Sequence, residues 1–181
     1  MAPDMSVPSR AELEALMATD VLTPIPSDSL LSVLANPPFV PTRSLFNIRD
    51  AGAVDGSALP TGRIFRCGLL EFAAKDPEAV TWLSEHVTHI FDLRRPDERM
   101  KSPDPDIPGV KNVWYEADGL YEAPDLGIFA EGDGSAGWRE QYMSIAATHA
   151  PIIRAVLEHV RDRPTEGFLF HCTGQSLSPV T

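Results

Sequence analysis

The segment Gly167-Phe168-Leu169-Phe170-His171-Cys172-Thr173-Gly174 is the most informative part of this sequence. Its first four residues form a short apolar run, which is typical of a buried strand. The run ends at His171 and Cys172, and Thr173-Gly174 opens a loop. In parallel sheets, ligands bind beyond the carboxyl ends of the strands, so Cys172 lies at a candidate site.

Strand and helix patterns alternate along the rest of the chain. Further strands are expected at residues 63–67, 88–93 and 110–115, with a short extended piece at 44–47. Helices are expected after the Ser9–Glu12 capping box, from Asp28 or Ser29 to Ala35, after Asp76, and at 138–147 and 151–160. Residues 94–109 hold four prolines and are expected to form a surface loop.

This alternation predicts an α/β fold with a mainly parallel central sheet flanked by helices, incomplete at the C-terminus. Residues 1–38 are expected to be an N-terminal helical extension, and residues 39–181 the main domain. The acidic residues 116–133 are expected to form a long loop, either a lid or simply a solvated segment.

Composition excludes several classes of function. The 181 residues include 15 Lys and Arg against 26 Asp and Glu, and the net charge of −11 would repel nucleic acid and anionic membranes. No apolar run approaches the roughly 18 residues that an integral membrane segment needs. Cys67 and Cys172 form neither a disulfide framework nor a zinc pattern, so a reducing, cytoplasmic setting is expected.

A thiol at the end of a strand has two interpretations. As a thiolate it could attack phosphorus, with backbone N–H groups of the following loop cradling the phosphoryl oxygens. Gly174 suits such a loop because the backbone must turn without a Cβ in the way. A free cysteine is, however, also a common packed residue that behaves as a small hydrophobe. Cys172 alone does not distinguish a nucleophilic thiolate from a packed core thiol.

Four segments in order resemble the tyrosine/serine protein phosphatases that carry an HCxxGKxRTG signature. The resemblance covers about Leu45 to Gly174. Asn47–Gly52 (NIRDAG) is similar to the family's NFRDLGG, and Gly62–Gly68 (GRIFRCG) to its GRxxRSG. Phe91–Glu98 (FDLRRPDE) resembles DLRxxxE, and Phe170–Gly174 (FHCTG) resembles the opening of the signature.

The resemblance implies a cysteine-dependent phosphatase that needs no metal and no cofactor. Cys172 would be the nucleophile that forms a phosphocysteine, and His171 would orient the loop and favour the thiolate. The implied substrate-binding residues are Arg49, Asp50, Thr173 and Gly174, with Arg94 as a further supporting candidate. The implied partners are phosphorylated proteins, on tyrosine or in some members serine or threonine, or phosphoinositides.

Several of these residues also have simpler interpretations. Arg49 and Asp50 could form a surface ion pair, and Asp92 and Arg94 could cap a strand end and pair across the sheet. Cys67 is expected to be a packed core thiol. The remaining histidines show no metal-ligand spacing and are expected at the surface or on helix faces: His86, His89, His149 and His159.

The match to the signature stops after Gly174. The sequence continues Gln175-Ser176-Leu177-Ser178-Pro179-Val180-Thr181, so Leu177 stands at the acid position and Ser178 at the arginine position. The missing arginine would have made two charge-assisted hydrogen bonds of about 1.5–3 kcal/mol each, so its loss costs on the order of 10²–10⁴ in rate. We therefore expect a truncated phosphatase with little or no activity and a foreign tail. A non-catalytic binding module and a redox or sulfur-transfer protein are the alternatives.

Overall fold

The fold is known from a computed structural model that describes residues 7–20, 22–117 and 125–173. Within these ranges a five-stranded sheet has the order β1-β2-β5-β3-β4. Its strands are β1 Arg49–Asp50, β2 Ile64–Cys67, β3 His89–Asp92, β4 Lys111–Trp114 and β5 Phe168–His171. β2, β5, β3 and β4 pair in parallel, whereas β1 pairs with β2 in the antiparallel sense. The expected α/β fold is confirmed.

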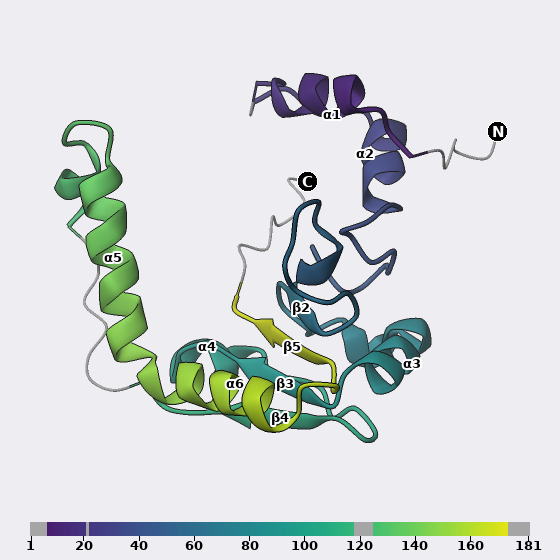
Figure 1. Ribbon diagram of the computed structural model, residues 1–181, viewed down its shortest axis with the longest axis vertical. Helices are drawn as coiled ribbons and strands as arrows, with labels where there is room; N and C mark the ends of the chain where they lie inside the picture. Colours follow the sequence, from purple (N-terminus) through teal and green to yellow (C-terminus); the bar gives the residue numbers. More distant parts are fainter. Residues whose placement is uncertain (1–6, 21, 118–124, 174–181) are drawn as a thin grey trace.

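Helices lie around this sheet (Figure 1). They are α1 Arg10–Met17, α2 Ser27–Leu34, α3 Pro77–His86, α4 Pro96–Lys101, α5 Ser135–Thr148 and α6 Ala150–Asp162, with short 3₁₀ turns at Ala51–Ala53, Ala73–Lys75 and Leu126–Phe129. α5 extends away from the sheet, and α1 and α2 lie together at the far side of β2 (Figure 1). In the described parts of the chain, no helix combines the length and the apolar character needed to cross a membrane.

The sheet has an apolar cluster on each face because side chains alternate along its strands. Phe65, Leu169 and Ile90 are register partners on β2, β5 and β3, and they pack with Leu83 of α3. On the other face, Phe91 and Phe168 pack with Ile152 of α6. Helices therefore cover both faces, as a parallel sheet requires.

The helix after Asp76 begins as the sequence predicts. The Asp76 carboxylate accepts hydrogen bonds from the backbone N–H groups of Glu78 and Ala79, which have no partner within the helix. Its other oxygen accepts a 2.8 Å hydrogen bond from the Ser44 hydroxyl. These bonds, that of Ser44 foremost, lower the pKa of Asp76. The cap thus also ties the chain near residue 44 to α3.

Two local predictions are wrong. Residues 44–47 do not form an extended piece: the backbone turns there, with Asn47 in the left-handed region at φ 56°. Asn tolerates that region better than most residues, which allows the strand to start after the turn, at Arg49. Residues 94–109 are not a continuous loop, because α4 lies within them. Pro96 occupies the first turn of α4, where its missing N–H costs nothing.

Candidate active site

Cys172 follows directly after β5, the central strand of the sheet, and its side chain is exposed. Cys67, at the end of the neighbouring strand β2, is buried instead. Burial raises the pKa of the Cys67 thiol and keeps it protonated. Cys67 is therefore the packed core thiol that the sequence predicts, and Cys172 is the thiol that a solute can reach.

His171 is buried and lies on the other face of the strand from Cys172. Its Nε2 is 3.0 Å from Oδ2 of Asp104 and 3.8 Å from Oδ1 of Asp92. The side chain thus holds the end of β5 against the segment that follows α4. This placement suits an orienting role for the loop after Cys172.

Arg94 is the centre of a buried charged cluster. Its Nε and one terminal nitrogen donate to the two oxygens of Asp92 at 2.8 and 2.9 Å, and the same terminal nitrogen donates to Asp104 at 2.7 Å. The other terminal nitrogen donates to the Ser102 carbonyl at 2.6 Å. Since the Arg94 side chain is only 1% exposed, its guanidinium is not available to a solute. These contacts favour the simpler interpretation of Asp92 and Arg94 over substrate binding.

The charges of this cluster compensate one another. Burial alone would raise the pKa of Asp104, but the hydrogen bond to His171 and the charges of His171 and Arg94 outweigh it and lower that pKa. Asp92, Asp104 and His171 are close enough to share a metal ion. Arg94 already occupies both carboxylates, however, so a cation has no place there.

Thr173 is held by α4, the helix that the sequence did not predict. Its hydroxyl donates a hydrogen bond to Oε1 of Glu98. The other oxygen of Glu98 accepts from the Arg95 backbone N–H at 3.0 Å, as a residue in the first turn of a helix does in a capping box. Burial opposes the charge of Glu98, but the bonds from Thr173 and Arg95 outweigh it and lower its pKa. Gly174, the other predicted loop residue, lies outside the described residues.

Arg49 and Asp50 form hydrogen bonds with different partners rather than an ion pair with each other. Asp50 accepts hydrogen bonds from the backbone N–H of Gly52 at 2.8 Å and of Gly62 at 2.7 Å, and so closes the loop between them. Gly52 is required there, since a Cβ would lie 2.3 Å from the Pro60 carbonyl oxygen. Arg49 donates to the Asn47 amide oxygen at 2.6 Å.

Arg66 is a candidate that the sequence-based prediction missed. The register pairs Arg49 with Arg66, and Arg66 with Phe170 of β5. Phe170 and Cys172 are two positions apart, and side chains at that spacing share a face, so Arg66 and Arg49 lie on the face of Cys172. The spacing of strands and of residues along them puts the Cα of Arg66 about 8 Å from the Cα of Cys172. Partial burial and the charge of Arg66 lower the pKa of Arg49. The signal was present in GRIFRCG, but only strand pairing identifies the face.

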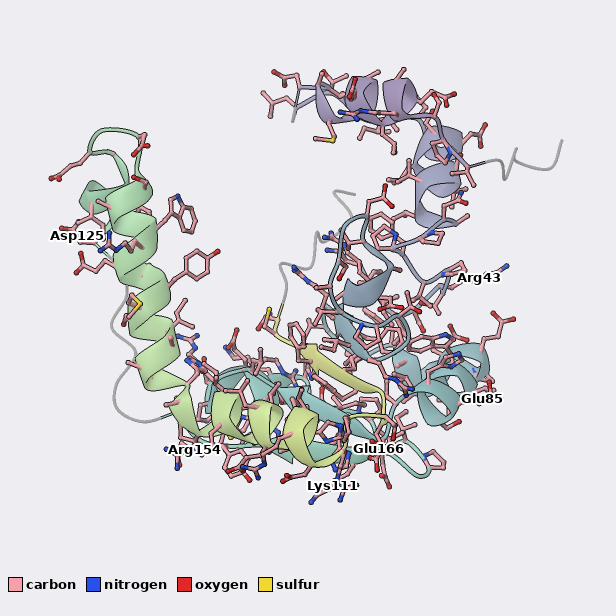
Figure 2. All side chains as sticks on the ribbon, viewed as in Figure 1. Arg43, Glu85, Lys111, Asp125, Arg154 and Glu166 are labelled. Atoms are coloured by element: carbon pink, nitrogen blue, oxygen red, sulfur yellow. The ribbon has the colours of Figure 1, made fainter. Side chains whose placement is uncertain are left out.

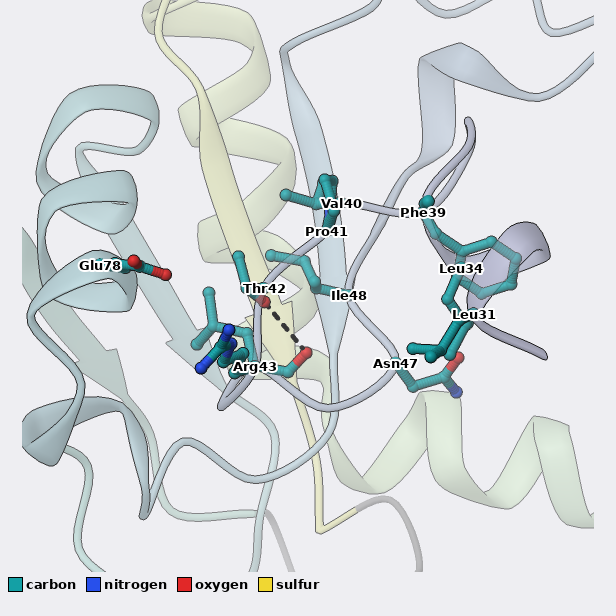
Figure 3. A pocket seen from close by; sticks show the side chains of 12 residues that line it. Leu31, Leu34, Phe39, Val40, Pro41, Thr42, Arg43, Asn47, Ile48 and Glu78 are labelled. Atoms are coloured by element: carbon teal, nitrogen blue, oxygen red, sulfur yellow. Dashed lines mark hydrogen bonds between the residues drawn. The ribbon is translucent and has the colours of Figure 1, made fainter. Parts of the chain in front are cut away.

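A cavity of about 470 Å³ lies elsewhere, between α2 and the segment that leads to β1 (Figure 3). Its lining is mostly apolar, with Leu31, Leu34, Phe39 and Ile48 among the side chains shown. Neither Cys172 nor Arg66 lines it. This cavity is therefore separate from the thiol.

Cys172 is thus an accessible thiol at the carboxyl end of the central strand, the place where ligands bind in α/β proteins with parallel sheets. A family model described as the tyrosine phosphatase family matches residues 40–174, about three quarters of the chain. The chain therefore belongs to the tyrosine phosphatase family. Comparison with curated proteins gives no match.

Proposed function

We propose that this protein is built as a phosphoric monoester hydrolase with Cys172 as its nucleophile. The observation that carries the proposal is the exposed Cys172 at the end of β5, within the segment that matches the family. The thiolate would attack phosphorus and form a sulfur–phosphorus bond, while the bond from phosphorus to the ester oxygen breaks and the leaving oxygen takes a proton from water. Water would then cleave the resulting phosphocysteine and release inorganic phosphate.

Phosphotyrosine is the substrate that we propose, because the family is one of tyrosine phosphatases. The net charge of −11 repels a phosphate at long range, so a local positive site must attract it. Arg66 and Arg49 supply two positive charges on the face of Cys172. Thr173 and Gly174 belong to the loop at the phosphate, and His171 is a positioning residue.

We propose further that the 181-residue chain hydrolyses phosphate esters slowly at best. Ser178 stands six residues after Cys172, where the signature has an arginine, so the two hydrogen bonds of that arginine to the phosphoryl oxygens are missing. Arg66 would approach the phosphate from a neighbouring strand rather than from the loop itself. Its bonds to the transferring phosphoryl group would differ in direction from those of a loop arginine, and transition-state stabilisation depends on that direction.

A restored arginine tests both proposals. Ser178→Arg places an arginine six residues after Cys172, and we expect it to raise p-nitrophenyl phosphate hydrolysis by about 10²–10⁴. Thr181→Arg is the matched control, with the same charge at the wrong distance, and should leave the rate unchanged. Cys172→Ser in the Ser178→Arg background should abolish turnover. Rapid turnover by the unaltered chain would contradict the proposed inactivity, and turnover without Cys172 would contradict the proposed nucleophile.

A non-catalytic phosphotyrosine-binding module is the second candidate, favoured by the charges of Arg66 and Arg49 in a chain without the loop arginine. Fluorescence anisotropy with a labelled phosphotyrosine peptide distinguishes the two. A binding module should bind the peptide without hydrolysing it, and should lose at least tenfold in affinity on Arg66→Gln. If Arg66→Gln binds the peptide with the affinity of the parent, the support for this candidate is lost.

A further inference from the structure

A second cluster of polar side chains lies at the opposite edge of the sheet from Cys172. His89 is the first residue of β3, Glu166 lies two residues before β5, and His159 lies on α6. One ligand atom from each of the three residues lies within 4.8 Å of the other two. The length of β5 separates this cluster from Cys172 by roughly 13 Å. Glu166, labelled in Figure 2, lies in the short connection between the end of α6 and the start of β5.

His159 has a buried nitrogen without a partner. The residue lies on a face of α6, one of the two placements expected for it, and is 6% exposed. Within the described structure its Nε2 has no hydrogen-bond partner. The His159 ring packs edge-on against Phe91 and Phe168, with ring centroids 5.6 and 5.0 Å apart. Aromatic edges cannot satisfy a ring nitrogen in the way that a polar ligand does.

The tautomer of His89 follows from its neighbour Thr88. The Thr88 hydroxyl donates its one proton to Oε2 of Glu166, at 2.8 Å. The 2.9 Å contact between Thr88 Oγ1 and His89 Nδ1 must therefore have the His89 N–H as donor. The lone pair of His89 is then on Nε2, as in a histidine that binds a metal and donates its other N–H.

The cluster thus offers two imidazole nitrogens and one carboxylate oxygen as ligand atoms. One of the nitrogens, Nε2 of His159, is buried and has no hydrogen-bond partner within the described residues.

We propose that His89, His159 and Glu166 bind one divalent transition-metal ion of the Zn²⁺ type. Neutral imidazoles and a carboxylate are the ligands that Zn²⁺ prefers, with water in the remaining position. In a tetrahedral Zn²⁺ site the ligand atoms lie about 3.3 Å from one another. The three side chains therefore move closer together when they bind the ion. Arg163, which contacts Glu166 at 3.2 Å and is half exposed, turns outward. The ion then connects α6 to the amino-terminal ends of β3 and β5, and takes no part in chemistry at Cys172.

Titration with metal ions tests the proposal. The chain with Cys172→Ser, which removes a competing exposed thiol, is titrated with Zn²⁺ by calorimetry and with Co²⁺ by visible absorption. We expect one ion per chain and a melting temperature about 5–10 °C higher at a hundredfold excess of Zn²⁺ over its Kd. Millimolar Mg²⁺ should not compete, because Mg²⁺ prefers oxygen ligands.

Three variants assign the ligands. His89→Gln and Glu166→Gln should each weaken Zn²⁺ binding at least tenfold while circular dichroism remains unchanged. His149→Gln, a matched control at the junction of α5 and α6, should bind as the parent does. The proposal fails if the folded parent binds no Zn²⁺, if Mg²⁺ displaces the ion, or if both ligand variants retain full affinity.

Discussion

At the scale of single residues, the two cysteines show how position on a strand sets the chemistry of a thiol. Cys172 and Cys67 end neighbouring strands, yet one is exposed and the other buried. We expect iodoacetamide to modify Cys172 in the folded protein. Cys67 should react on the order of 100-fold more slowly, because the structure must first open. Mass spectrometry of a native time course measures both rates, and equal rates would contradict the burial of Cys67.

The buried Arg94 gives a second prediction. Arg94→Ala leaves two carboxylates in the interior without their cation and should lower the free energy of unfolding by about 3–5 kcal/mol. Arg161→Ala is the matched control, because Arg161 forms an exposed ion pair with Asp162, and such surface pairs contribute little to stability. Urea unfolding measures the difference. Similar losses in the two variants would show that Arg94 has no special structural role.

The position and burial of a single residue were predictable only where a local sequence pattern determined its environment. The apolar run before Cys172 and the buried thiol of Cys67 followed from local patterns. The contribution of Arg66 depends on a strand pairing, and the buried position of His159 depends on how α6 packs against two phenylalanines. Such contacts join residues far apart in the sequence, and no local spacing encodes them.

At the scale of elements, the stability of the short helix α4 is connected to Thr173, the residue after Cys172. Glu98→Ala removes the acceptor of both the Arg95 N–H and the Thr173 hydroxyl, and should cost about 1 kcal/mol. Glu98→Gln is the matched control, because its amide oxygen can accept from the Arg95 N–H while its NH2 group donates to the Thr173 hydroxyl oxygen. Hydrogen exchange should show faster exchange at residues 96–101 in the alanine variant alone. Unchanged exchange there would contradict the role of Glu98.

The cap of α3 gives a dependence on pH. The folded state lowers the pKa of Asp76, so the carboxylate adds stability above its unfolded pKa of about 4, and this stability is lost as the pH falls through the folded value. Asp76→Asn retains a capping side chain without the charge. The parent should be the more stable protein at pH 7, and the difference should shrink below about pH 4. A difference that does not depend on pH would contradict this assignment.

Elements with strong end signals were predictable, and the short or weakly marked ones were not. Asp76-Pro77-Glu78 predicted α3 correctly because a cap, a proline and an acid agree. In 94–109 the prolines indicated a loop, although Pro96 occupies the one part of a helix that tolerates it. β1 has two residues and is held by pairing with β2, so its own sequence contains too little signal.

At the scale of the whole molecule, the proposed function requires a strongly negative protein to bind a negative ligand. The net charge of −11 would oppose an acidic phosphopeptide at long range, whereas the charges of Arg66 and Arg49 would attract its phosphate at short range. Added salt screens the long-range repulsion more than the short-range attraction. For the Ser178→Arg variant, we expect kcat/KM on an acidic phosphotyrosine peptide to rise several-fold between 20 and 150 mM NaCl. A basic peptide should show the opposite trend, and a common trend for both peptides would contradict this account.

The order of the sheet has a consequence for how the protein assembles during synthesis. β5 lies between β2 and β3, but a hundred residues separate β2 from β5 along the chain. Until β5 leaves the ribosome, β2 and β3 each present an open edge that can pair with a neighbouring nascent chain. Because so distant a pairing must form before the sheet closes, folding should be slow and should benefit from chaperones that shield those edges.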